Sequence, residues 1–296
     1  MRRLALLALL PLIAAAPPAE NKKLTPTDVV AQMGDEFWIT IPAEDLLVMT
    51  LEGGSRVVIQ LAPEFAPVHV ANIRKMATSG YWQGATVYRV QDNYVAQWGL
   101  GEAERALPEG VVKLPPHEYW RPVKGVAFQA VGASDPYSKQ AGFSNGWPVA
   151  TYKDGTASLT HCYGAVGVAR DLAPDTGSSS ELYTIIGHAP RQLDRNIAIV
   201  GRVIEGIENL SSLPRGTDKM GFYAKGQAAR PIQSVHLASS MPVETRPSFQ
   251  HLDDSTAGFA QYAKVRMNRD DDFYRVAAGG ADICNIPVPI RPTPKK

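Results

Sequence analysis

The feature that most constrains the fold of this chain is a pair of short apolar runs joined by two glycines. Residues 46–51 and 56–61 are rich in Leu, Val and Ile, which favours β-strands. Gly53 and Gly54 lie between them, and glycine readily adopts the positive φ angles that a tight hairpin turn requires. The pair therefore predicts an antiparallel β-hairpin.

Further short strands follow along the chain, interrupted by two helices. A helix is expected at residues 67–79, because Val70, Ile73 and Met76 recur at helical spacing, and a shorter one at residues 207–213. Strands are expected at residues 86–90, 93–97, 126–131, 157–160, 164–169, 181–187, 197–203 and 232–237. Many short strands with two helices predict a mainly β protein, a closed antiparallel barrel capped by two helices.

The N-terminus has the pattern of a cleavable export signal. Met1-Arg2-Arg3 is a positive head, residues 4–16 form an apolar stretch, and small residues up to Ala19 offer a cleavage site. The apolar stretch is too short for a good membrane span. We expect residues 1–19 to be removed and the protein to be exported to the periplasm, with an uncleaved N-terminal anchor as the alternative.

Charge and composition exclude several classes of partner. Loss of residues 1–19 removes two of the 30 basic side chains and leaves 28 basic against 29 acidic ones. A chain this close to neutral has no electrostatic basis for binding nucleic acid or an anionic membrane. Apolar residues make up 45% of the chain, which is typical of a globular protein and not of a disordered one.

The chain has two cysteines, Cys162 and Cys284. In an exported protein they could form a disulfide. Nothing in the sequence brings the two side chains together, so we expect two buried free thiols, with the disulfide as the alternative.

Arg89 and Gln97 are the first candidate functional pair. They lie on two expected strands joined by a short turn at Gln91-Asp92, and strand geometry can bring both side chains to one face. A guanidinium on such a face presents a fixed fork of N–H donors to a carbonyl or an amide. An arginine taken alone is more often a solvated surface residue, so the surrounding sequence has to decide.

Several motifs around this pair resemble the cyclophilin-type peptidyl-prolyl isomerase family. The resemblance spans residues 46–99 and 164–237. The motifs that carry it are Gly80-Tyr81-Trp82-Gln83-Gly84, Val87-Tyr88-Arg89-Val90, Tyr94-Val95-Ala96-Gln97-Trp98-Gly99, Gly164-Ala165-Val166-Gly167-Val168-Ala169 and Leu193-Asp194-Arg195-Asn196-Ile197. It implies a cyclophilin-like barrel and prolyl isomerase activity that needs no metal or other cofactor.

The resemblance also implies roles for individual residues. Arg89 takes the place of the family's main catalytic residue. Tyr94 and Tyr183 take the places of the pocket aromatics, and we expect their hydroxyls near the pocket rim. The other substrate-binding positions correspond to Val95, Gln97, Ala169, Arg170, Glu181 and Leu193.

Five positions depart from the usual pattern of the family. Tyr94 and Tyr183 replace phenylalanines, and Glu181 replaces a glutamine. Gln192 replaces a frequent tryptophan, and Ile197 replaces the pocket histidine. We therefore expect a proline pocket that is more polar at its aromatic residues and lacks an imidazole.

The carboxylate of Glu181 has two interpretations. If it is ionised in the groove, it should favour basic peptides over acidic ones. Alternatively it pairs with Arg89 or Arg170 and only positions that side chain.

The whole chain divides into a signal peptide (1–19), a lead-in (20–45), a cyclophilin-like domain (46–238) and a C-terminal extension (239–296). In the lead-in, Thr25 is expected to cap a helix. Residues 100–160 form an insertion, which we expect to be a long, ordered loop that lines the substrate groove. The extension is expected to be either a strap on the barrel or a separate interaction segment.

The leading hypothesis is a prolyl isomerase that assists the folding of exported proteins. Its partners would be proline-containing polypeptides, in unfolded or loop segments of envelope proteins, and Arg89 would hydrogen-bond the prolyl nitrogen. The alternative is a non-catalytic peptide-binding or chaperone module on the same fold. Other chemistries have weaker support, because His161-Cys162 adjacency does not assemble a protease site and the histidines lack zinc-like spacing.

Overall fold

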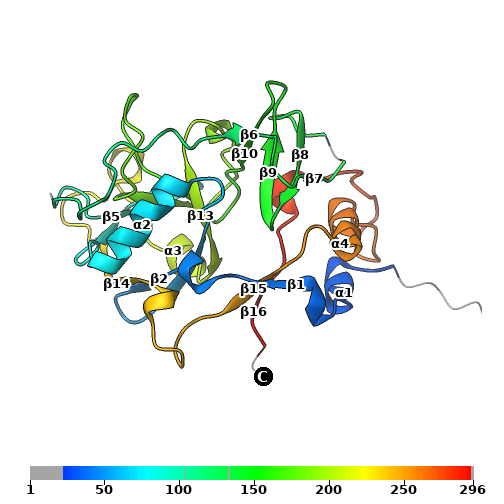
Figure 1. Cartoon of the computed structure of the whole chain (residues 1–296), viewed down its shortest axis with the longest axis horizontal. Helices are drawn as coiled ribbons and strands as arrows, with labels where there is room; N and C mark the ends of the chain where they lie inside the picture. Colours follow the sequence, from blue (N-terminus) through cyan, green and yellow to red (C-terminus); the bar gives the residue numbers. More distant parts are fainter. Residues whose placement is uncertain (1–22, 104, 133, 295–296) are drawn as a thin grey trace, which may run out of the picture.

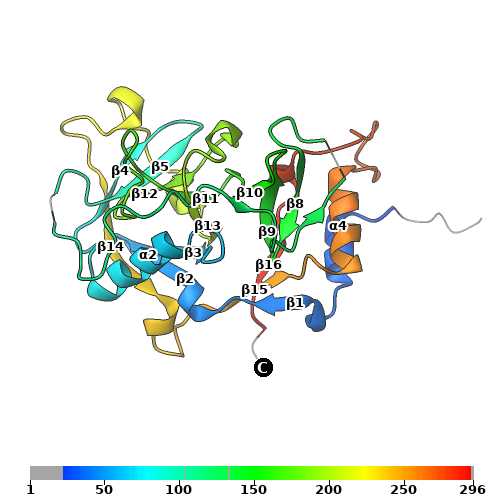
Figure 2. The ribbon, with the colours of Figure 1, turned by 45° about the horizontal axis from the view of Figure 1, so that its top comes forward.

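The computed structural model of the protein describes residues 23–103, 105–132 and 134–294 (Figure 1). The expected signal peptide lies outside these residues. The described chain forms two lobes that lie side by side in both views, a β-barrel and a smaller mixed lobe (Figures 1 and 2). No described helix is both long and apolar enough to span a membrane.

The larger lobe is the predicted closed antiparallel barrel, with eight strands. Around the wall the strands are β11 (Ala165–Val168), β12 (Leu182–Ile185), β5 (Val95–Gly99), β4 (Thr86–Val90), β14 (Arg230–Leu237), β2 (Leu46–Leu51), β3 (Arg56–Leu61) and β13 (Ile199–Glu205). β13 pairs with β11 and closes the ring. The barrel core includes fully buried Leu47, Ile59, Val87 and Trp98.

Two hairpins of the barrel show how turn residues set the strand bounds. In the β2–β3 hairpin Thr50 pairs with Arg56, and Gly53 and Gly54 have φ angles of 84° and 87°, which confirms the predicted turn. Strand β5 begins two residues later than predicted, because Asn93, with a φ of 50°, belongs to the turn.

Two helices cover the barrel, α2 (Pro67–Ser79) and α3 (Glu208–Ser211). Helix α2 ends at Gly80 in the left-handed conformation, as predicted. Its first turn has no cap from its own N-cap residue. Instead the Glu118 carboxylate, from the insertion, accepts the backbone N–H groups of Val68 (2.8 Å) and His69 (3.0 Å). The insertion is therefore fastened to the barrel at this helix end.

The insertion contains a five-stranded antiparallel sheet, whereas the sequence predicts a long, ordered loop with two strands at residues 126–131 and 157–160. Its strands, in order across the sheet, are β6 (Arg121–Pro122), β10 (Thr156–Leu159), β9 (Trp147–Thr151), β8 (Gln140–Ser144) and β7 (Gln129–Ala130). Strands β8 and β9 are joined by Asn145-Gly146, with φ angles of 51° and 78°. Two consecutive positive φ angles are what a two-residue hairpin turn of this kind requires.

The lead-in and the extension complete the smaller lobe together with this sheet. They supply helices α1 (Pro26–Ala31) and α4 (Ala257–Met267) and a second sheet of β1 (Trp38–Thr40), β15 (Phe249–Leu252) and β16 (Ile290–Pro292). Thr25 caps α1, as predicted. Val29 from the lead-in, Phe143 from the insertion and Phe259 from the extension belong to one apolar core. The extension is thus an integral part of a folded lobe, and not a strap or a separate segment.

Cys162 and Cys284 form a disulfide, so the expectation of free thiols is wrong. The sulfur atoms lie 2.02 Å apart, and the bond joins the segment just after the insertion to the extension. The two cysteines are 122 positions apart in the chain. Only the packing of the two segments in the smaller lobe brings them together.

We expect Phe143→Ala to lower the free energy of unfolding by about 3–5 kcal/mol, the usual cost of removing a large core side chain. Phe143 is 1% exposed, and its ring centroid lies 4.9 Å from that of Phe259. Urea unfolding followed by circular dichroism would measure the change. Leu172→Ala is the control, because Leu172 is 88% exposed and should change stability by less than about 0.5 kcal/mol. A Phe143→Ala protein as stable as the wild type would contradict a core shared by insertion and extension.

Candidate active site

Arg89 lies on β4, directly opposite Gln97 on β5. Its Nη1 donates to Gln97 Oε1 (2.9 Å), its Nη2 donates to Gln91 Oε1 (2.6 Å) and its Nε donates to the Met220 carbonyl (2.8 Å). Three acceptors on different segments fix both the position and the plane of the guanidinium. The prediction that Arg89 and Gln97 share one face is confirmed.

Two aromatic rings lie against this guanidinium. The Phe222 ring centroid is 5.2 Å from the central carbon of Arg89, and the Tyr94 centroid is 6.0 Å from it. Such contacts favour a cation and give the site apolar walls. Phe222 was not identified from the sequence, because it lies in no recognised motif and reaches Arg89 only through a backbone bridge between its loop and β4.

Gln97 is held in turn by a second chain of hydrogen bonds. Its Nε2 donates to the Tyr88 hydroxyl (2.7 Å), and that hydroxyl donates to Glu181 Oε2 (2.8 Å). Glu181 Oε1 accepts the backbone N–H groups of Leu100 (2.9 Å) and Gly101 (3.3 Å). The side chain that orients the guanidinium is therefore itself anchored to the backbone after β5.

Glu181 pairs with neither Arg89 nor Arg170, so that interpretation of its carboxylate is wrong. Both of its oxygens accept hydrogen bonds from neutral groups. A Cβ atom at position 99 would collide with this carboxylate, so Gly99 is needed for its close approach to β5. The preference for basic peptides stays a prediction.

Burial shifts the pKa values of this network. It raises the pKa of Glu181, although hydrogen bonds from Tyr88 and Leu100 partly oppose the shift. Burial, followed by the charge of Glu181, raises the pKa of Tyr88, so its hydroxyl stays protonated and donates to the carboxylate. Burial also lowers the pKa of Arg89, because the guanidinium has lost part of its hydration.

Four of the predicted substrate-binding residues meet in one apolar cluster: Tyr94, Val95, Ala169 and Tyr183. Strands β12 and β5 pair, which places Tyr183 opposite Gln97. Val95 and Tyr183 are almost fully buried, whereas Tyr94 and Ala169 are partly exposed. The apolar surface open to a substrate therefore comes chiefly from Tyr94 and Ala169, with Val95 and Tyr183 beneath them.

The hydroxyl of Tyr183 is not near a pocket rim, contrary to the expectation. It is buried and lies 3.1 Å from His161 Nε2, with the two ring planes only 12° apart. A Cβ atom at Gly167 would collide with this hydroxyl. The site thus has an imidazole next to its aromatic wall, although Ile197 occupies the position where the family carries one. His161 was not identified as a site residue because it lies between the insertion and the next recognised motif.

The backbone at Ala169-Arg170 forms an open edge beside the cluster. The N–H of Ala169 donates to the Glu181 carbonyl (2.9 Å). Within the described residues, the N–H and the carbonyl of Arg170 have no hydrogen-bond partner, whereas the Ala169 carbonyl lies close against Gly177. An extended peptide could therefore pair with this segment as an added strand.

Arg170 and Leu193 are the predicted binding residues that do not belong to the apolar cluster. Arg170 Nη2 donates to the Asn196 carbonyl (2.8 Å), and its guanidinium lies 5.7 Å from the Tyr119 ring centroid. Leu193 is partly exposed in the short turn Arg191–Leu193 and does not belong to the apolar cluster. The assignment of Leu193 to the proline pocket stays a prediction.

A hollow of about 430 Å³ adjoins this site. Gln97, Glu181 and Arg170 lie along one side, and the insertion contributes Lys113 and Leu114. The insertion therefore forms one wall of this hollow, and its part in a substrate groove stays a prediction.

The site offers a fixed cation, aromatic walls and an open backbone edge. No group of three or more His, Cys, Asp or Glu side chains in the described part of the chain is arranged to hold a metal ion. What these groups can do is donate hydrogen bonds to an amide and hold an apolar ring.

Comparison with known proteins identifies the family. The sequence profile described as cyclophilin-type peptidyl-prolyl cis-trans isomerase matches residues 46–240. The chain belongs to the cyclophilin family. It is a peptidyl-prolyl cis-trans isomerase, and its substrates are proline-containing peptides.

The names of related proteins state the same activity. A probable peptidyl-prolyl cis-trans isomerase of Brucella suis is 25% identical over 178 residues, which cover 59% of this cyclophilin and 74% of that protein. Peptidyl-prolyl cis-trans isomerase B of Bacillus subtilis is 24% identical over 166 residues, covering 56% and 88%. The crystal structure of cyclophilin AquaCyp293 from Hirschia baltica is 26% identical, covers 91% of this chain and 98% of its own, and superposes with a TM-score of 0.69.

We expect Glu181→Gln to change how the stability of this cyclophilin depends on pH. Because burial raises the folded-state pKa of Glu181 above its usual value of 4.5, the folded protein holds this proton more tightly than the unfolded chain. The contribution of Glu181 to the free energy of unfolding therefore falls as the pH rises from about 4.5 through the folded-state pKa. Glutamine does not titrate, so the unfolding free energy of the variant minus that of the wild type should grow over this window and then level off.

Urea unfolding of both proteins at several pH values would measure this difference. A difference that is constant with pH, or that shrinks as the pH rises, would contradict burial of the carboxylate as the cause.

Proposed function

We propose that Arg89 catalyses the isomerisation by donating a hydrogen bond to the prolyl nitrogen. Of its five N–H groups, three are engaged by Gln97, Gln91 and the Met220 carbonyl. One N–H on each terminal nitrogen has no acceptor among the described residues, and these remain for a substrate. This fixed, partly unsatisfied guanidinium is the observation that carries the proposal.

The proposed hydrogen bond acts by lowering the bond order of the amide C–N bond. An X–Pro bond crosses a barrier of about 18–20 kcal/mol, because its C–N bond has partial double-bond character. A hydrogen bond to the prolyl nitrogen keeps the lone pair on that atom and so favours the twisted state. A charge-assisted bond contributes about 1.5–3 kcal/mol, which corresponds to about a ten- to hundredfold rate increase. The remaining acceleration would come from holding the twisted peptide in a water-poor groove.

The other groups of the site bind the peptide in this proposal. The proline ring packs on the apolar surface of Tyr94 above Val95, which removes apolar area from water. The chain before the proline pairs with the open backbone edge at Ala169-Arg170. Gln97 keeps the Arg89 fork in place while the carbonyl before the proline rotates.

We further propose that this isomerase is exported and assists the folding of envelope proteins, acting on prolines in unfolded or loop segments. Two observations support this proposal. Residues 1–19 have the pattern of a cleavable signal peptide. The Cys162–Cys284 pair is oxidised, and disulfides persist mainly in oxidising compartments such as the periplasm.

Replacing Arg89 with Ala should lower kcat/KM for a short X–Pro peptide by about ten- to a hundredfold or more. Arg89→Lys should lose most of the activity as well, because an ammonium lacks the planar fork that Gln97 and the substrate share. Exchange spectroscopy of the cis and trans peptide signals would measure the rates.

The matched control is Arg56→Ala. Arg56 lies on β3 and pairs with Glu205, away from the groove, so this variant should keep wild-type activity. An Arg89→Ala protein that is folded and fully active would refute the catalytic assignment.

Expressed with its full leader in a Gram-negative host, the protein should be recovered from the periplasm, shortened near residues 15–19 and with Cys162 and Cys284 paired. Mass spectrometry of the periplasmic fraction would test all three points. Leu7→Arg is the control, because a charge in the apolar stretch should block export. Recovery of the full-length wild-type chain from the cytosol or the membrane would refute the proposal.

A further inference from the structure

His161 is buried beside the proposed groove and takes no part in the mechanism above. It lies between the end of strand β10 and Cys162, directly after the insertion. Its side chain is 0% exposed, and its Nε2 lies 3.1 Å from the hydroxyl of Tyr183. Tyr183 in turn lies under the apolar surface that includes Tyr94 and Ala169.

The hydrogen bonds around His161 fix its tautomer. Asp194 Oδ1 accepts both the backbone N–H of His161 (2.8 Å) and its Nδ1 (2.9 Å). A carboxylate can only accept, so Nδ1 carries the proton of the neutral ring. Nε2 is then an acceptor, and the Tyr183 hydroxyl donates to it. The phenol ring is thus held at its far end by a directional bond.

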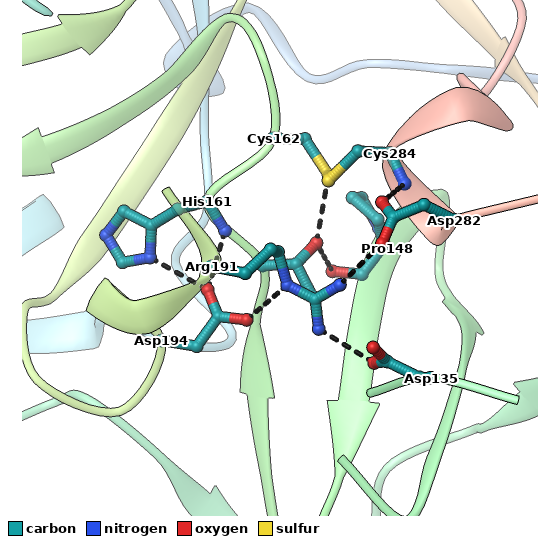
Figure 3. Close-up of a disulfide and its surroundings, with 9 residues drawn as sticks. Asp135, Pro148, His161, Cys162, Arg191, Asp194, Asp282 and Cys284 are labelled. Atoms are coloured by element: carbon teal, nitrogen blue, oxygen red, sulfur yellow. Dashed lines mark hydrogen bonds and ion pairs between the residues drawn. A yellow bond between two sulfur atoms is a disulfide. The ribbon is translucent and has the colours of Figure 1, made fainter. Parts of the chain in front are cut away.

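Arg191 holds Asp194 from the other side. Its Nε donates to Asp194 Oδ2 (2.5 Å), its Nη2 to Asp135 (2.8 Å) and its Nη1 to Asp282 (3.4 Å). Burial alone would lower the pKa of Arg191, but Asp194 and Asp135 outweigh it and raise that pKa, so the guanidinium stays charged. Asp135 comes from the insertion and Asp282 from the extension, and Arg191 joins both to the loop that carries Asp194 (Figure 3).

The disulfide links two of these same segments covalently. Cys162 directly follows His161, and its partner Cys284 lies two residues after Asp282. The Asp282 carboxylate accepts the backbone N–H of Cys284 (2.8 Å) and also contacts Arg191. The backbone that presents His161 is therefore fastened to the extension by one covalent bond and one ionic cluster (Figure 3).

We propose that His161 is a positioning residue of the isomerase, which fixes Tyr183 beneath the proline-binding surface, and that the disulfide and Arg191 hold His161 in place from the extension. The inference rests on the proposed function in one respect: it assumes that the proline ring packs above Tyr183. It assigns to the smaller lobe a role in substrate binding. The sequence motifs of the barrel do not indicate such a role.

The role differs from simple stabilisation in what it predicts. A network that only stabilises the fold would leave the affinity for proline peptides unchanged under conditions in which the variant is fully folded. A network that orients Tyr183 sets the shape of the proline-binding surface, and small displacements of such groups weaken binding of the substrate. Peptide affinity and the rate at saturation must therefore be measured separately.

The test compares three variants. His161→Phe keeps a planar ring and removes both hydrogen bonds, whereas His161→Gln keeps a donor for Asp194 and an acceptor for Tyr183. Tyr183→Phe removes the hydroxyl alone and keeps His161. The Kd of an isotope-labelled Ala-Pro peptide is measured by NMR titration, and the saturated rate by exchange spectroscopy, at temperatures where circular dichroism shows each protein fully folded.

We expect His161→Phe and Tyr183→Phe to raise the Kd by about three- to tenfold, the loss that one hydrogen bond implies, with a nearly unchanged saturated rate. His161→Gln should stay within about twofold of the wild type. Replacing both cysteines by Ser should also raise the Kd of the peptide. If His161→Phe does not fold, Tyr183→Phe alone decides.

An unchanged Kd in folded Tyr183→Phe, or equal effects of His161→Phe and His161→Gln, would overturn the proposal. The failure of the catalytic proposal looks different, because it concerns the saturated rate of Arg89→Ala and not the peptide affinity of these variants. The two results can therefore be told apart.

Discussion

The hydrogen bond from Arg89 to Gln97 is the contact on which the rest of the site depends. An arginine side chain carries about 2 kcal/mol of rotamer entropy, which a flexible cation would lose when it met its substrate. Here that entropy is lost during folding, because Gln97, Gln91 and the Met220 carbonyl already hold the fork. The short turn between β4 and β5 makes the two strands neighbours, and their register places the two side chains opposite each other. The position of the cation is therefore a property of the strand pairing.

The smaller lobe is built around the same groove from outside the barrel. The insertion caps α2 through Glu118 and contributes Lys113 and Leu114 to the wall of the hollow, and the residue directly after it, His161, reaches Tyr183. The lead-in and the extension bury the other side of the insertion in a common apolar core. The Hirschia baltica cyclophilin, which matches 91% of the chain, has a similar overall extent. A segment that lies outside the barrel motifs is thus part of the architecture that shapes the groove.

Most of the barrel could be predicted from the sequence, because strand alternation and turn glycines are local signals. The β2–β3 hairpin and the Gly80 helix end are examples. Arg89 and Gln97 could be paired because a short turn joins their strands. The Asn145-Gly146 turn is an equally local signal, but the many prolines and aromatic residues around it favoured the prediction of a loop.

Phe222, His161 and the Cys162–Cys284 pair could not be predicted. Each reaches its partner only after distant segments have packed, and the cysteines are 122 positions apart. Burial of the Tyr183 hydroxyl could not be predicted for the same reason, since it depends on the imidazole of His161, which comes from a distant segment.

The distribution of strand ends has a further consequence. A catalyst of extended, proline-containing chains meets many segments that could add to an open sheet and start aggregation. The closed barrel has no edge strand, and the two smaller sheets end on β6, β7, β1 and β16, which are only two or three residues long, with Pro122 in β6 and Pro292 in β16 unable to donate. Outside the peptide site proposed at Ala169-Arg170, the described chain therefore offers strand-like substrates only short edges to join.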